Sequence, residues 1–193
     1  MVHRLEKARE ILHKLDANTL ERRAGRLSKL PTITFSGDMP SRTFSLLSEA
    51  DSCFINGEYN GCVAVLATAV EYSLRKLLNE KLGLQTLIVR ATTRGILNEE
   101  DAKVLDQLRQ YRNNAIHSDL TELARGVVLR KQEVILTEKG EVPMSDWREV
   151  QPESEAMKDA AGSLAAEAVV GKLVVSVCGV LRKLYGGTLW ESS

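Results

Sequence analysis

Aromatic residues, cysteine and proline are all scarce in this sequence. Aromatic residues make up 5% of its 193 residues, fewer than the strands of a β-sandwich usually carry. Four prolines and thirteen glycines are too few for a Pro/Gly-rich disordered chain. Apolar residues make up 44% and are mostly Leu, Ala and Val, so the composition favours an all-α protein. The length fits a single domain.

Neither sign of charge is in excess, because 26 Lys and Arg residues balance 26 Asp and Glu residues. The net charge therefore demands neither a nucleic acid nor a membrane as partner, although charges could still cluster locally. Charges do cluster in residues 1–30, which carry eight cations and four anions and therefore a net charge of +4. Such a segment is either a solvated helix face or a surface for nucleic acid or a protein partner. A low net charge also permits self-association.

The three cysteines occur without the CxxC or CxxH spacing of a metal site. Their odd number and wide spacing argue against a disulfide framework and against zinc. They lie in apolar stretches, so we expect buried free thiols in a reducing compartment.

No stretch is expected to enter a membrane or to direct secretion. The N-terminus, MVHRLEKAREILHKL, is amphipathic and lacks the apolar core of a signal peptide. The most apolar run, residues 165–181, is short and is interrupted by Glu167 and Lys172. We therefore expect a cytoplasmic protein without membrane contact.

Hydrophobic periodicity predicts an up-and-down bundle of about five to six helices. We expect helices over residues 3–30, 42–56, 59–82, 84–94, 98–117 and 153–185. Ser41 and Asn98 are expected to cap the second and fifth helices, and Gly83 to end the third. Side chains expected to face the core are Phe44, Leu47, Ala50 and Phe54; Val63, Leu66, Val70, Leu74, Leu77 and Leu78; Val104, Leu108, Tyr111 and Ala115; and Leu164, Ala168, Leu173, Val177, Leu181 and Leu184.

The remaining segments are short. Residues 31–40, PTITFSGDMP, are expected to form a loop because of their Pro and Gly content. Residues 126–150 are β-branched around Glu138-Lys139-Gly140, which predicts a small β-hairpin insertion before the last helix. The expected organisation is one domain over 1–193. It has an N-terminal charged helix (1–30), a core (42–119), the insertion (126–150) and a C-terminal helix (153–185).

The fifth expected helix ends in the segment YRNNAIHSD, which gathers Arg112, Asn113, Asn114 and His117. Arginine can hold phosphate oxygens through its planar fork of donors. Histidine can exchange a proton near neutral pH. Together these groups suit the cleavage of a phosphodiester without a metal ion or cofactor. The structural alternative is a helix C-terminus where His⁺ complements the dipole and arginine forms a salt bridge.

The spacing of the two groups suggests how they could meet. On an ideal helix, positions 112 and 117 lie about 140° apart around the axis, so they do not share a face. If both side chains act on one phosphate, the helix must fray near its end, or a second copy of the chain must supply one of them. This favours a composite site in a homodimer.

The order of segments adds to this interpretation. The helix NGCVAVLATAVEYSLRKLL, the short segment TLIVRATTRGILN and the helix that ends in YRNNAIH together resemble the HEPN superfamily. The resemblance is greatest to its small stand-alone bacterial branch of proteins of unknown function, and it covers about residues 42–119 and, more loosely, the last helix. It implies an all-α bundle in which Arg112 and His117 are catalytic, Asn113 is the polar residue of the motif, and two motifs of a homodimer face one cleft. We expect the neighbouring amide of Asn114 to support the site as well.

Glu71 resembles a glutamate often seen on the corresponding helix of the related branch. It could pair with Arg112 across two helices and orient its guanidinium. Alternatively, it could pair with Arg75, four residues further along the same helix, which is worth about 0.3–0.5 kcal/mol. Both alternatives remain open at the level of sequence.

The resemblance implies a metal-independent endoribonuclease, of the toxin or phage-defence kind, that leaves 2′,3′-cyclic phosphate ends. Its partners would be RNA or a nucleotide, a second copy of itself and a cognate antitoxin protein. The alternative is a non-catalytic HEPN-like module that binds nucleotides or partners. The zero net charge favours this alternative, because tight RNA binders usually display a basic stripe.

Overall fold

The computed structural model describes residues 19–34, 38–117, 129–131, 134–137, 140–143, 148–150, 155–186 and 188–190. Side chains are not described for residues 32–34, 115–117, 129–150, 155–161 and 188–190. The chain divides into two compact units, Met1–His117 with Val170–Ser193, and Ser118–Val169. The single domain over residues 1–193 stays a prediction.

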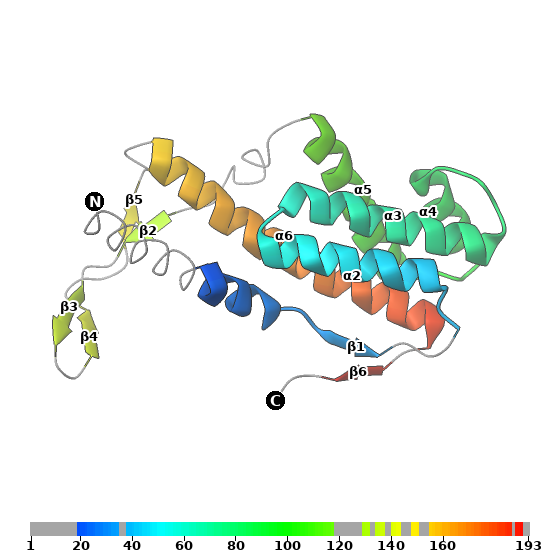
Figure 1. Cartoon of the computed structure of the whole chain (residues 1–193). Helices are drawn as coiled ribbons and strands as arrows, with labels where there is room; N and C mark the ends of the chain where they lie inside the picture. Colours follow the sequence, from blue (N-terminus) through cyan, green and yellow to red (C-terminus); the bar gives the residue numbers. More distant parts are fainter. Residues whose placement is uncertain are drawn as a thin grey trace, which may run out of the picture. The chain divides into compact units, whose positions relative to one another are not determined.

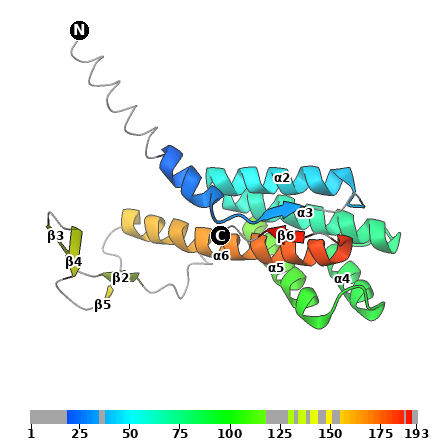
Figure 2. The same ribbon diagram turned by 90° about the horizontal axis from the view of Figure 1, so that it is seen from below.

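Helices dominate the described residues, which confirms the all-α expectation. They are α2 (Ser41–Asn56), α3 (Tyr59–Leu78), α4 (Leu84–Thr93), α5 (Glu99–His117) and α6 (Glu155–Tyr185), labelled in Figure 1. Residues 19–27 are also helical, and the helix ends three residues before the expected end at residue 30. Residues 3–18 of the expected N-terminal helix lie outside the described part. In the first unit, α2 and α3 lie side by side in both views (Figures 1 and 2), and α4 and α5 pack against α3.

Local signals set most of the helix ends. Gly57 ends α2 with a left-handed φ of 81°, as its position after Asn56 predicts. Asn98 caps α5 as expected, because its Oδ1 accepts a hydrogen bond of 2.8 Å from the backbone N–H of Asp101. Two expected caps are wrong. Pro40 occupies the capping position of α2 without a side-chain bond, so Ser41 is the first helical residue.

The second wrong cap concerns the end of α3. Asn79, with a φ of 54°, ends this helix, and its N–H bonds to the carbonyl of Arg75. Asparagine tolerates the left-handed conformation better than other side chains do. The helix therefore stops before Gly83, which instead precedes the first residue of α4.

The core of the first unit is formed by α2, α3, α4, α5 and the last part of α6. Its largest fully buried side chains are Phe54, Leu66, Leu74, Leu87, Leu105, Leu108, Leu181, Val63, Val70, Val170, Val174 and Val177. A Cβ at Gly171 would lie 3.1 Å from the ring of Phe54, so this glycine lets α6 approach α2 closely.

Some residues expected in the core are not buried. Phe44 is 57% exposed, Leu77 is 39% exposed and Leu164 is 67% exposed, and Ala168 is exposed as well. In α5, Leu105 is fully buried whereas Val104 and Tyr111 are only half-buried, so the buried face is rotated by one residue. The side chain of Ala115 lies outside the described residues.

Short strand pairs accompany the helices. In the first unit, β1 (Thr32–Thr34) pairs antiparallel with β6 (Thr188–Trp190), with Ile33 opposite Leu189, so the expected loop 31–40 is wrong over β1. In the second unit, β2 (Leu129–Lys131) pairs with β5 (Arg148–Val150), and β3 (Val134–Thr137) with β4 (Gly140–Pro143). Residues 138 and 139, the expected turn, lie outside the described residues.

The cysteines form no disulfide bond with one another. All three thiols are free, with Cys62 and Cys178 buried and Cys53 half-buried.

One helical segment is apolar over a considerable length. Gly162–Tyr185, at a mean hydropathy of 2.0, is long and apolar enough to cross a membrane by length and composition alone. Half of that window is buried in the structure, and the core helix of a soluble protein meets the same criteria. The helix is thus weak evidence for a membrane span.

Candidate functional site

Arg112 lies on the buried face of α5. Asp101, Leu105 and Leu108 are buried on this helix, and position 112 continues their spacing of four, three and four residues. Residues spaced in this way share one face of a helix. The side chain of Arg112 is accordingly 28% exposed. An arginine in such a position requires a partner, because its charge is partly removed from water.

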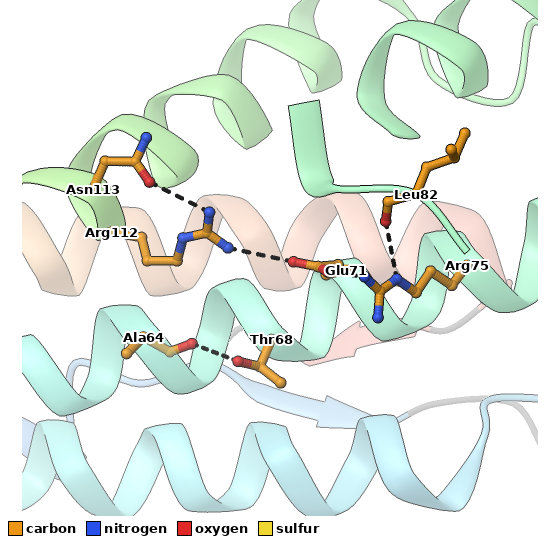
Figure 3. A network of polar contacts seen from close by, with 7 residues as sticks. All are labelled: Ala64, Thr68, Glu71, Arg75, Leu82, Arg112 and Asn113. Atoms are coloured by element: carbon orange, nitrogen blue, oxygen red, sulfur yellow. Dashed lines mark hydrogen bonds and ion pairs between the residues drawn. The ribbon is translucent and has the colours of Figure 1, made fainter. Parts of the chain in front are cut away.

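Glu71 of α3 provides that partner (Figure 3). Its Oε2 lies 3.3 Å from Nη1 of Arg112, and its Oε1 lies 2.5 Å from Nη2 of Arg75. Arg75 is held further by a hydrogen bond of 3.0 Å from its Nε to the carbonyl of Leu82. Both pairings considered from the sequence therefore exist together, since the two carboxylate oxygens serve different arginines.

The amide residues of the motif differ in their contacts. The Oδ1 of Asn113 accepts a hydrogen bond of 3.3 Å from Nη2 of Arg112, so it contributes to fixing the guanidinium. Asn114 is exposed. The Nε of Arg112 is buried and has no hydrogen-bond partner among the described residues. Its two terminal nitrogens thus carry the recorded contacts, one toward Glu71 and one toward Asn113.

His117 is the last residue of α5, and its side chain lies outside the described part of the chain. The helix continues unbroken from Arg112 to His117. Fraying of the helix before His117, one of the two routes by which the groups could meet, is therefore not seen. The site that the structure describes consists of Arg112, Glu71, Arg75 and Asn113.

A second arginine cluster, which the sequence analysis did not identify, lies just beyond the C-terminal end of α3 and on α4. The Oε1 of Glu80 is 3.3 Å from Nη1 of Arg90 and 2.6 Å from Nη2 of Arg94. Arg90 lies in the last turn of α4 and Arg94 directly follows the helix, so their i,i+4 spacing places them on the same side of its C-terminal end. That spacing could have indicated an arginine pair from the sequence. No neighbouring residue in the sequence indicates that Glu80, outside the helix, lies against the two arginines.

A groove of about 580 Å³ lies between α4 and α5. Its lining contains the apolar residues Ile88, Val89 and Ala102 together with glutamines, threonines, Lys103 and Asp106. Hydrogen bonds from Arg109, and from Gln110 as well, lower the pKa of Asp106, so this carboxylate is ionised at neutral pH. It is therefore no proton donor.

The described cysteines do not suit nucleophilic catalysis. Burial raises the pKa of the Cys62 thiol to about 12, and it raises the pKa values of Cys53 and Cys178. A thiol is nucleophilic as its thiolate, which these environments disfavour. Among the residues with described side chains, no three His, Cys, Asp or Glu side chains converge as metal ligands.

Comparison with known proteins gives no relative. No family model, no curated protein and no solved structure matches the chain. Any functional conclusion therefore depends on the geometry around Arg112 and on the sequence motif. Chemically, this geometry offers a half-buried guanidinium of fixed orientation at the end of a helix, which is suited to holding a phosphate or another oxyanion.

Proposed function

We propose that this chain is a metal-independent endoribonuclease of the HEPN type, acting as a homodimer with a composite site of Arg112 and His117. The observation that carries the proposal is the placement of Arg112. It is an arginine on the buried face of α5, held by Glu71 and Asn113, five residues before His117. A charged side chain in a costly position, oriented by two partners, is typical of a functional site.

In the proposed reaction the 2′-hydroxyl of RNA attacks the adjacent phosphorus. The imidazole of one His117 removes the hydroxyl proton as the new O2′–P bond forms. The P–O5′ bond breaks, and the leaving oxygen takes a proton from the second, protonated His117. Arg112 stabilises the charge that builds on the phosphoryl oxygens. The products are a 2′,3′-cyclic phosphate and a 5′-hydroxyl, and DNA resists because it lacks the attacking group.

Glu71 has a positioning role in this proposal. By accepting from Nη1 of Arg112 and from Nη2 of Arg75, it limits the rotamers of both arginines. An arginine that is oriented in advance loses less conformational entropy when it binds a phosphate. Asn113 restrains the other terminal nitrogen, and Asn114 is exposed beside it.

The second candidate function is a non-catalytic module that binds a nucleotide or a protein partner. The ion pair between Glu71 and Arg112 favours it, because a carboxylate at 3.3 Å partly neutralises the guanidinium that a phosphate would require. The net charge of zero favours it as well. In this case Arg112 joins α5 to α3 and has no role in a reaction.

The proposal includes the wider setting of the site. We place it in a cytoplasmic toxin or phage-defence protein with a cognate antitoxin. The fold would be an up-and-down bundle with a hairpin insertion over residues 126–150. The antiparallel pairing of β3 with β4 supports the hairpin, and the half-buried α6 supports a soluble chain.

The deciding experiment is RNA cleavage in EDTA by the purified full-length chain, beside His117→Ala and Arg112→Gln. The ribonuclease predicts cleavage that resists EDTA, leaves cyclic phosphate ends and is lost in both variants. Gln107→Ala, which removes an exposed amide side chain of the same helix, serves as the matched control and should leave the rate close to that of the wild type. Cleavage that persists in His117→Ala would overturn the composite site of Arg112 and His117. No cleavage of any RNA tested would support the binding module instead.

A further inference from the structure

Two carboxylates in the first unit each hold a pair of arginines. Glu71 contacts Arg75 and Arg112, and Glu80 contacts Arg90 and Arg94. The second set, here called the Glu80 triad, consists of Glu80, Arg90 and Arg94. It repeats the arrangement around Arg112 at a place where the proposed reaction makes no use of it.

The carboxylate of the Glu80 triad is the more buried partner. The side chain of Glu80 is 20% exposed, against 52% for Arg90 and 48% for Arg94. Its Oε2 is buried and has no hydrogen-bond partner among the described residues. A carboxylate in this position depends on its two arginines for compensation, and it therefore draws both guanidinium groups to one point.

The two arginines retain unused donors. Each guanidinium carries five N–H donors, and each places one nitrogen on the same Oε1 of Glu80. Their side chains make no other contact recorded with the described residues, and about half of each remains exposed. The triad keeps a net charge of +1. Two adjacent, oriented guanidinium groups match the oxygens of one phosphate.

The triad is connected to the candidate catalytic site through one loop. Arg75, held by Glu71, donates to the carbonyl of Leu82, and Glu80 belongs to the same stretch between α3 and α4. Lys81, between them, is exposed. Arg75 thus contacts one residue of this loop, and Arg90 and Arg94 contact another. A polynucleotide presents several phosphates along one chain, so it can contact arginines at separate places on a surface.

We infer that Arg90 and Arg94, held together by Glu80, bind one phosphate of the RNA chain at a position away from the cleaved bond. This inference rests on the proposed function, because it assigns the substrate path of the same site. A contact to a phosphate carries no sequence information, so this contact should add affinity for any sequence without a base preference.

The test is binding of a single-stranded RNA whose riboses are all 2′-O-methylated, which the proposed reaction cannot cleave. The test variant is Glu80→Gln with Arg90→Gln and Arg94→Gln, since removal of the arginines alone would leave a buried carboxylate unpaired. The control makes the same charge change at exposed positions of the first unit, Arg42→Gln, Lys172→Gln and Glu49→Gln. Thermal unfolding verifies that both variants are folded.

The dissociation constant is measured by fluorescence anisotropy over a range of salt concentrations. Loss of one phosphate contact should reduce the slope of log Kd against log salt by about 0.7, equally for RNAs of different sequence, whereas the control should keep the original slope. An unchanged slope in the folded test variant would overturn the inference. So would competition by a mononucleotide at the concentration at which the RNA binds, since that would identify a site for free nucleotides.

The inference and the proposed function fail separately. Cleavage of unmodified RNA that disappears in His117→Ala, with an unchanged salt slope in the test variant, would remove the inference alone. A reduced slope without any cleavage would remove the ribonuclease, and the Glu80 triad would remain a phosphate contact of an RNA-binding module.

Discussion

Replacing Asp51 by asparagine should stabilise the protein at neutral pH. Asp51 lies on α2, largely removed from solvent, and burial raises the pKa of its carboxyl group to about 6. The titratable groups recorded near it are the thiols of Cys62 and Cys178, which are neutral at this pH. No hydrogen bond or ion pair to the described residues compensates the charge. An asparagine of the same shape carries no charge to desolvate.

The sign and size of the effect follow from linkage. The folded-state pKa lies above the unfolded value, so the folded chain binds the proton more tightly between pH 4 and pH 6. The free energy of unfolding should therefore fall as the pH rises through this window, and it should become level above it. Two pH units correspond to about 3 kcal/mol at most. Because the carboxyl is partly exposed, we reduce this to about 1–2 kcal/mol.

The measurement is urea unfolding of the wild type and Asp51→Asn at pH 4, 5, 6 and 7 at constant ionic strength. Other groups that titrate in this range are common to both proteins, so their contribution cancels in the difference. The difference should be near zero at pH 4 and reach about 1–2 kcal/mol in favour of asparagine at pH 7. A variant that is less stable than the wild type at pH 7 would show that the Asp51 carboxylate has a stabilising partner, and would refute the reasoning.

Further predictions concern packing and assembly. Leu105→Ala should lower the free energy of unfolding by about 2–5 kcal/mol because it leaves a cavity. Val104 is half-buried, so Val104→Ala should lower it by less than about 1 kcal/mol. Equal losses of the two variants in urea unfolding would contradict the rotated buried face of α5. Gly57→Ala should cost about 1–2 kcal/mol by thermal unfolding, since its φ is 81° and a Cβ would meet the guanidinium of Arg26 at 3.0 Å. Light scattering at micromolar concentration should give twice the chain mass of 21.4 kDa, and a monomer would count against the composite site.

The helices were predictable because their determinants are local. Gly57 and Asn98 act within a few residues of the ends that they set. The strand β1 was not predictable in the same way, since its partner β6 lies at the opposite end of the sequence. The short segment between Pro31 and Gly37 has the composition of a loop, and pairing with a distant strand gives its first three residues an extended conformation.

The buried face of α5 shows why periodicity can err by one residue. Counting apolar residues favours Val104, Leu108 and Tyr111, whereas the structure buries Asp101, Leu105 and Leu108. Both sets have helical spacing, and they share Leu108. Asp101 is buried because its Oδ1 lies 2.6 Å from Nζ of Lys183 in α6. The sequence does not show this ion pair, so a count of apolar residues alone leaves Asp101 off the buried face.

The contacts of Arg112 were likewise not determined by local sequence, and they matter for the proposed function. Considered alone, an arginine near the end of α5 flanks the core, and its partner is a choice between alternatives: Glu71 serves either Arg75 on its own helix or Arg112 on the next. A carboxylate has two oxygens with separate lone pairs, and the structure uses one for each arginine. Local pairing therefore does not compete with pairing across helices. Arg75 instead occupies one oxygen of Glu71, and the other oxygen is the one that Arg112 contacts, which joins the candidate site to the end of α3.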